Sequence, residues 1–241
     1  MDYLDAPDPA TLPTARPFIG RTVVMFVDPQ VADAPTLASD LLFMRRLGVR
    51  PLVVHEASDA STGSHLVGML NRVGGEAVRI DGTSAGTLIV ASDDAGNPTV
   101  RTVNAQLMEL LLDQGYIPVF AAEGAAITGV PVNVDGAEAA RALAAATHAV
   151  RLLLPAKRGG VPCAQTGIIE ELTSSEALEL ASAGTLADEL CRELTAAALG
   201  VRAGVDAAQL LDLSGQHAAI IEMLTSRHVG TQVVSNIVLS R

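Results

Sequence analysis

The sequence predicts an α/β fold with a mainly parallel β-sheet, and three observations indicate this class. Apolar runs of strand length alternate with longer segments of helical periodicity, an order typical of βαβ units. The chain is 49% hydrophobic but only 2% aromatic, so its core is aliphatic, which suits parallel strands buried on both faces. Gly48, Gly115 and Gly200 stand where helical segments give way to apolar ones, as helix C-caps do.

The individual elements follow from the same patterns along the 241 residues. A Pro- and Asp-rich N-terminal arm, residues 1–17, is expected to hold at most a short helix, and residues 18–241 to form one domain. Strands are predicted at the short apolar runs 22–27, 51–55, 77–80, 117–121, 150–154, 208–213 and 231–234. Helices are predicted at the longer periodic segments 36–47, 103–114, 134–147, 174–182, 186–199 and 216–225.

Charge and cysteine content exclude several classes of partner. A formal net charge of −11 at pH 7 argues against nucleic acid and anionic membranes, since both require a basic face. The two cysteines, Cys163 and Cys191, have no metal-ligand spacing, so no metal site is predicted. Without a signal peptide or an apolar run of about 18 residues, the expectation is a soluble cytoplasmic protein with free thiols.

Ligands of parallel sheets bind where the strands end, and several residues of interest follow predicted strands. The first strand ends in Val27-Asp28-Pro29, without the glycines or lysine that a phosphate site normally has. His55 ends the second strand and is either an acid/base group or a packed structural histidine; the structural interpretation is favoured. Lys157 and Arg158 follow a later strand and either hold an anion or lie in a solvated loop.

Two further motifs leave alternatives open. Asn133 precedes a predicted helix N-cap, Asp135, and either hydrogen-bonds an anionic ligand at the helix start or has a structural role only. Residues 82–86 match the G-x-S-x-G nucleophile elbow of serine hydrolases, which requires a strand, a turn and a helix around Ser84. Because the residues after the motif are β-branched, a Gly-rich turn between strands is the favoured interpretation.

Several segments, taken in order, resemble the amino-acid kinase family, in particular acetylglutamate kinases of the arginine-inhibited type. The first, residues 12–24, resembles that family's LP…RFxGKTxVIKYGG pattern. The others are 47–55 (GxxPVVVHGGG), 71–78 (INxxGGxAVGLSGKDG), 115–119 (GxIPV), 133–146 (NxNADxxAxxLAxxL) and 214–236 (RxxHxLLLEFTxxGxGTxISN). Their order, rather than any single motif, makes the resemblance specific.

The resemblance implies a three-layer αβα sandwich, with an acyl-amino-acid lobe over about 18–130 and a nucleotide lobe over about 131–241. It implies phosphoryl transfer from ATP, with Mg²⁺, to a carboxylate, and a homo-oligomer, dimer or higher, to which the N-terminal arm contributes. Glu222 and the Gly230-Thr231 turn fall where the arginine-inhibited relatives bind arginine, and the histidine of that site falls on Gln209.

Most of the family's catalytic positions are changed in this chain. By the resemblance, the first lysine falls on Met25 and its two glycines on Val27 and Asp28. The second glycine-rich loop falls on residues 56–58, and the lysine of SGKDG falls on Thr83. The organising aspartate falls on Ala137, and the later lysine falls on Asp188 or Glu189. The nucleotide-side aspartate falls on Lys157. Only residues 56–70, without an arginine, stand between His55 and Asn71, where the family has a substrate lid.

No catalytic residue is therefore assigned. Because phosphoryl transfer depends on cations, here replaced by a thioether and carboxylates, we expect a regulatory or structural paralogue that has lost kinase activity. The alternative is an active ATP- and Mg²⁺-dependent kinase of N-acetylglutamate or a related acyl-amino acid. Lys157 and Arg158 would then replace the lost cations, and Asn133 and His55 would hold the substrate. A small amino-acid ligand and a link to arginine or related amino-acid biosynthesis are further expectations.

Overall fold

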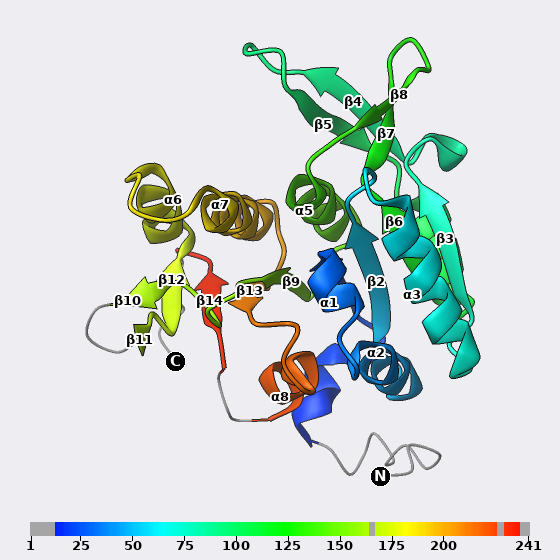
Figure 1. The fold of residues 1–241 in the computed structure, drawn as a ribbon, viewed down its shortest axis with the longest axis horizontal. Helices are drawn as coiled ribbons and strands as arrows, with labels where there is room; N and C mark the ends of the chain where they lie inside the picture. Colours follow the sequence, from blue (N-terminus) through cyan, green and yellow to red (C-terminus); the bar gives the residue numbers. More distant parts are fainter. Residues whose placement is uncertain (1–12, 164–166, 226–228, 237–241) are drawn as a thin grey trace.

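The computed structural model describes residues 13–163, 167–225 and 229–236, and its centre is an eight-stranded sheet (Figure 1). All seven predicted strands lie in this sheet. In spatial order it comprises β12 (Glu171–Thr173), β14 (Thr231–Val234), β13 (Ala207–Leu211), β9 (Arg151–Pro155), β1 (Thr22–Val27), β2 (Arg50–His55), β6 (Ile117–Ala121) and β3 (Ala77–Asp81).

The strands from β13 to β3 are mutually parallel, so their carboxyl ends meet at one edge. The register of β1 pairs Val27 with His55 on β2, and Met25 with Leu153 on β9. Only the pairing of β13 with β14 is antiparallel within this sheet, and β12 runs parallel to β14. This arrangement puts the turns after β9, β1 and β2 side by side, which is where parallel sheets bind ligands.

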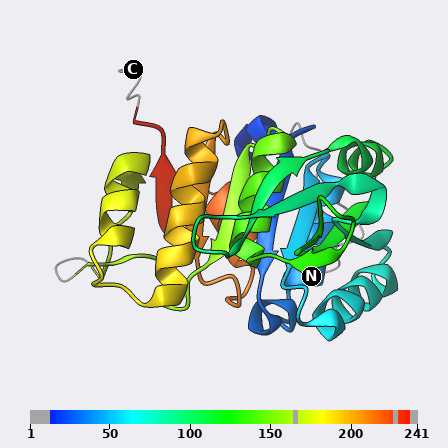
Figure 2. The ribbon, with the colours of Figure 1, turned by 90° about the horizontal axis from the view of Figure 1, so that it is seen from above.

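Helices cover both faces of the sheet, which confirms the predicted three-layer αβα sandwich (Figure 2). One face packs against η2 (Pro13–Phe18), α1 (Pro29–Ala32), α2 (Leu37–Arg46), α3 (Ala60–Arg72) and α8 (Ala218–Leu224). The other packs against α4 (Gln106–Asp113), α5 (Gly136–Ala146), α6 (Ser174–Ser182) and α7 (Asp188–Arg202). Residues 1–12 of the predicted arm lie outside the described residues, and residues 13–17 belong to η2.

Several parts of the fold, among them α1 and β12, were not predicted. Helix α3 occupies most of the segment between His55 and Asn71, and buries Leu66 and Leu70, although Gly63 and Gly68 weaken its helical pattern. A separate sheet has the order β5 (Pro98–Val103), β4 (Leu88–Ser92), β7 (Glu123–Ala126) and β8 (Pro131–Asn133), and β10 (Pro162–Cys163) pairs with β11 (Gly167–Ile168).

The G-x-S-x-G motif forms the favoured turn rather than a nucleophile elbow. Ser84–Gly86 is a single 3₁₀ turn, η3, and strand β4 follows it where an elbow requires a helix. The Ser84 hydroxyl donates to Asp81 Oδ1 at 3.2 Å, and Asp81 also accepts the backbone N–H groups of Thr83 and Ser84. Thr83 and Ser84 therefore belong to a turn held by Asp81.

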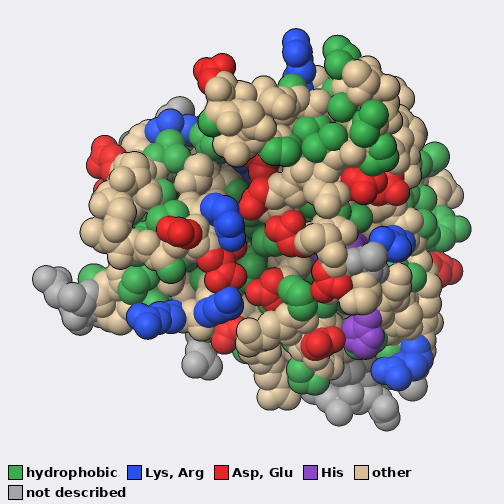
Figure 3. Space-filling model, turned by 45° about the horizontal axis from the view of Figure 1, so that its top comes forward, with side chains coloured by type: hydrophobic (Ala, Val, Ile, Leu, Met, Phe, Trp, Pro, Cys, Tyr) green, Lys and Arg blue, Asp and Glu red, His purple; other side chains and the backbone are tan. Residues whose placement is uncertain are grey.

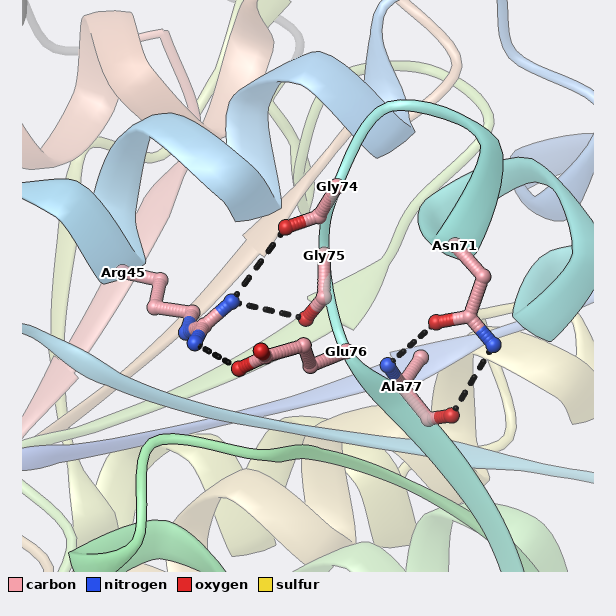
Figure 4. Close-up of polar contacts among 6 residues, drawn as sticks. All are labelled: Arg45, Asn71, Gly74, Gly75, Glu76 and Ala77. Carbon is pink, nitrogen blue, oxygen red and sulfur yellow. Dashed lines mark hydrogen bonds and ion pairs between the residues drawn. The ribbon is translucent and has the colours of Figure 1, made fainter.

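The turn between α3 and β3 shows what a retained family motif does for the fold (Figure 4). The Asn71 side chain accepts from the Ala77 N–H at 2.6 Å and donates to the Ala77 carbonyl at 3.2 Å. From α2, Arg45 donates to the carbonyls of Gly74 and Gly75 and pairs with Glu76. These contacts tie α2, α3 and β3 together at the amino edge of the sheet.

Candidate functional site

The candidate site is a half-open pocket of about 330 Å³ at the carboxyl ends of β1 and β9, beside the start of α7. Its charged lining comes from three elements and comprises Asp28, Lys157, Arg158, Glu189 and Glu193. The rest of its wall is largely apolar, with Pro155, Ala156, Pro162, Leu186, Ala187 and Leu190. Figure 3, with the top of the molecule turned forward, shows acidic and basic side chains close together on this face.

Asp28 is the first residue after β1, and its carboxylate is already used by the fold. It caps the short helix α1, because its Oδ1 accepts the Val31 backbone N–H at 2.8 Å. This capping explains locally why an Asp-Pro pair ends the strand, since Asp is a favoured N-cap and Pro a favoured first helical residue. The Asp28 carboxylate therefore lines the pocket at the turn after β1, where the sequence has neither the glycines nor the lysine of a phosphate site.

Lys157 and Arg158, the predicted anion-binding residues, both lie at the pocket, but the positive charge of Lys157 is balanced by a carboxylate in an ion pair. Its Nζ donates to Glu189 Oε2 at 2.8 Å. This hydrogen bond and the charge of Glu189 raise the pKa of Lys157, so the ammonium stays charged and paired. Arg158 is exposed at the rim. Glu189, one of the two positions assigned to the later catalytic lysine, thus pairs with the cation nearest to it.

Glu56 places a carboxylate at the N-terminus of α5. Its Oε1 accepts the Gly136 backbone N–H at 3.0 Å, a contact between residues far apart in the sequence. Helix N-termini attract anions, and here the protein's own carboxylate takes that place. Burial raises the pKa of Glu56, while the hydrogen bond from Gly136 acts in the opposite direction. Glu56 begins the segment on which the resemblance places the second glycine-rich loop.

Glu193 lies one helical turn after Glu189 on α7 and is only 4% exposed. Among the described residues its Oε2 has no hydrogen-bond partner. Burial raises the pKa of Glu193 to about 8, and the neighbouring charges of Glu189 and Asp135 act in the same direction. At neutral pH this side chain is therefore a protonated carboxylic acid in the pocket wall.

Met25, the position to which the resemblance assigns the first catalytic lysine, does not line the pocket. Met25 and Val27 point to the face covered by α2 and α3, where both side chains are buried in the core. Phe26 points to the other face, and a Cβ at Gly136 would come within 2.3 Å of its ring. In the family's pattern the lysine stands six residues after the glycine that matches Gly20, which is position 26. A strand alternates its faces, so this shift of one residue moves the position to the ligand side.

The other predicted site residues do not converge on the pocket. His55 is fully buried, its Nδ1 lies 2.8 Å from the Glu56 carbonyl, and its ring packs against Gly63. Burial lowers the pKa of His55, which favours the neutral form. Asn133 is exposed and pairs with Glu123 in the smaller sheet. Ala137 is buried in the core, and Asp188 is exposed in the first turn of α7.

The region assigned to arginine in the relatives is held together by internal hydrogen bonds. Glu222 accepts from Gln209 Nε2 at 3.0 Å and from the Val229 N–H at 2.7 Å. Thr231 donates to the Ile169 carbonyl at 2.6 Å and accepts from the Val161 N–H at 2.8 Å. These contacts link β13, α8 and β14 in this chain.

Sequence reasoning missed the part that Glu193 and Glu56 take in the site. The i, i+4 spacing of Glu189 and Glu193 on a predicted helix puts both on one face, and this was the available signal. Neither the burial of Glu193 nor the contact of Glu56 with Gly136 follows from any local pattern.

The chain is similar to known proteins along most of its length, although no family model matches it. It is 28% identical to an acetylglutamate kinase of Syntrophus aciditrophicus, over 92% of this chain and 94% of that protein. It is 29% identical to an acetylglutamate kinase of Dinoroseobacter shibae, over 92% of this chain and 93% of that protein.

Solved structures with the same fold have lower sequence identity. N-acetylglutamate synthase from Neisseria gonorrhoeae, solved with coenzyme A and N-acetyl-glutamate, superposes with a TM-score of 0.82 at 20% identity. The match covers 97% of this chain but spans only 63% of the synthase chain. Carbamate kinase from Giardia lamblia bound to AMP-PNP superposes with a TM-score of 0.65 at 13% identity, over 90% of this chain.

The fold, the strand order and the sequence similarity agree. None of the helices in the described ranges has both the length and the apolar character needed to cross a bilayer. The chain has the amino-acid kinase fold and is similar in sequence to acetylglutamate kinases.

Proposed function

We propose that this chain is an acetylglutamate-kinase-like paralogue that has lost phosphoryl transfer and acts as a regulatory or structural protein. One observation carries the proposal: two groups that could bind phosphate at the ligand edge, the Gly136 N–H and the Lys157 ammonium, are paired with the protein's own carboxylates. Glu56 takes the Gly136 N–H at the start of α5, and Glu189 takes the Lys157 ammonium. Asp28 adds a third carboxylate to the same edge.

These pairings should weaken ATP binding and phosphoryl transfer strongly, because polyphosphate binding depends on cations and free N–H groups. The loss of one such stabilising group commonly costs about 10²–10³ in rate. At this edge, position 26 carries a phenyl ring and position 137 a methyl group, both buried. ATP and Mg²⁺ therefore fit the residues poorly, and no catalytic step is assigned to them.

The motifs that are retained support a scaffold role. Asn71 and the glycines after it hold the turn between α3 and β3, and Asn236 accepts the Ser175 N–H at the start of α6 at 3.1 Å. We include in the proposal a homo-oligomer, dimer or larger, and a role beside arginine or related amino-acid biosynthesis. The proposal also includes the small amino-acid ligand expected from the sequence. Multi-angle light scattering tests the oligomer.

A second candidate is an active kinase of N-acetylglutamate or a related acyl-amino acid. The names of the relatives favour it, as does the presence of Lys157 and Arg158 at the pocket. In this case a substrate would have to displace Glu189 from Lys157. The two candidates differ in whether ATP is consumed.

A coupled assay of ATP turnover with N-acetylglutamate and a panel of acyl-amino acids separates them. We expect no turnover above background and no increase in melting temperature with Mg²⁺-ATP, since a ligand that binds only the folded state raises that temperature. Turnover that disappears in Lys157→Ala but persists in Arg72→Ala, a distant exposed control, would establish the second candidate.

A further inference from the structure

The pocket contains one group that the loss of kinase activity does not explain. The side chain of Glu193 is only 4% exposed, and in the part of the chain described here its Oε2 has no hydrogen-bond partner. Leaving a buried polar atom unpaired costs about 1–3 kcal/mol, so each such atom calls for an explanation, such as strain, a bound ion or a bound molecule. Glu193 is also one of the residues that line the pocket.

The surroundings of Glu193 restrict the chemistry of that ligand. Glu189 and Arg192 flank it on α7, Asp135 approaches from the start of α5, and Asp28 and Lys157 come from the ends of β1 and β9. Lys157 is paired with Glu189, and Arg192 Nε lies 3.5 Å from Asp135. Lys157 and Arg192 are therefore matched by carboxylates, Arg158 is exposed at the rim, and within the described ranges Glu193 takes part in no ion pair.

We propose that this pocket binds a small organic amine, with its basic nitrogen on Glu193 and its apolar body against Pro155, Leu186 and Leu190. The inference rests on the proposed function, because it takes the nucleotide edge of the fold to be closed to phosphates. A volume of about 330 Å³ suits a compact ligand, near the lower end of the range for small-molecule sites. A buried carboxylate is stabilised by a partner of opposite charge, whereas an anionic ligand would meet the like charges of Asp28 and Glu189.

Binding is coupled to a proton. The free pocket holds Glu193 as a carboxylic acid at pH 7, since burial raises its pKa to about 8. When an alkylammonium ion binds, the O–H bond of Glu193 breaks, its proton leaves to solvent, and the carboxylate pairs with the ammonium. One proton is released for each ligand bound below pH 8, and affinity rises with pH up to that value.

Isothermal titration calorimetry with matched probes tests the proposal. The probes are hexylamine, hexanol and hexanoate, which share a chain and differ in the head group, and Mg²⁺-ATP is titrated separately. At pH 7 we expect hexylamine to bind at least tenfold tighter than hexanol, and hexanoate not to bind. In Glu193→Gln the amine preference should disappear, whereas Glu109→Gln, an exposed change on α4, should retain it.

Titrations in two buffers of different ionisation enthalpy count the released protons in the unmodified protein. This count keeps the test decisive if Glu193→Gln fails to fold. Equal affinity for hexylamine and hexanol, no binding of any probe, or no proton release would overturn the inference and leave the proposed function standing. Turnover of ATP would instead overturn the proposed function, and tight Mg²⁺-ATP binding in this pocket would overturn both.

Discussion

The two edges of the main sheet differ in what their polar side chains do. At the amino edge, Arg45 and Asn71 bind backbone groups of the turn before β3, and the family's motif is retained there (Figure 4). At the carboxyl edge, Asp28, Glu56 and Glu189 occupy the groups that a phosphate would need, and the family's motifs are changed. The comparison indicates that the fold depends on the amino edge, while the chemistry of the carboxyl edge can change without loss of the fold.

The largest expected effect is a pH dependence of stability that comes from Glu193 at the carboxyl edge. The pKa of Glu193 is raised to about 8 in the folded protein, above its ordinary value of 4.5. Between these two pH values Glu193 keeps its proton in the folded state and loses it in the unfolded state. The free energy of unfolding is therefore highest below pH 4.5 and falls as pH rises toward 8. Glu193→Gln removes this loss, and its free energy of unfolding should exceed that of the unmodified protein by on the order of 3 kcal/mol at pH 8.

Urea unfolding from pH 5 to pH 8.5 measures this difference. The gain should shrink as pH falls toward 5, and Glu109→Gln should show no such trend. A gain that is independent of pH would mean that Glu193 is ionised in the folded protein.

Next in size is a steric test at the amino edge, with two adjacent glycines. A Cβ at Gly75 would lie 2.8 Å from the Leu70 carbonyl oxygen, so Gly75→Ala forces the backbone to move and should cost about 2 kcal/mol. Gly74 has φ +85° and open space around it, so Gly74→Ala should cost only about 1 kcal/mol from backbone strain. Equal costs in chemical denaturation would show that the turn adapts freely.

Removal of the Asn71 side chain should have a smaller effect. Asn71→Ala deletes both hydrogen bonds to Ala77, which lie near the surface, and should destabilise the fold by about 1 kcal/mol. Thermal unfolding checks this, with Arg72→Ala as the neighbouring exposed control. If both variants unfold at the same temperature, the motif is not retained for the fold.

The smallest expected effect is a gain of anion binding at the carboxyl edge. Glu189→Gln releases Lys157 from its ion pair and should leave stability unchanged, because the pair is exposed. Affinity for pyrophosphate should rise a few fold at low ionic strength, as measured by calorimetry, and Glu179→Gln on α6 should not change it. No gain would mean that Asp28 and Glu56 alone are enough to exclude phosphate.

Much of the fold could be predicted from local patterns, and the exceptions have physical causes. The apolar runs gave all seven predicted strands because buried parallel strands are continuously hydrophobic. Helix α3 was missed because glycines and small polar residues dilute its periodicity, although Leu66 and Leu70 still bury its inner face. Local patterns say less about the site, because one residue decides the face of a strand: Met25 lies in the core covered by α2 and α3, and Phe26 lies on the other face of β1.

The sequence by itself determined the order of most strands and helices and the resemblance to acetylglutamate kinases, and from that resemblance it predicted the absence of lysines and glycines at the ligand edge. Only the tertiary structure decided that Glu56 meets Gly136, that Glu189 meets Lys157, and that Glu193 is buried with its Oε2 unpartnered among the described residues. Patterns of period 2 and 3.6 depend on neighbours in the chain, and so they can be recognised locally. The charge state of the pocket depends on residues brought together by strand order and helix packing, which local patterns do not contain.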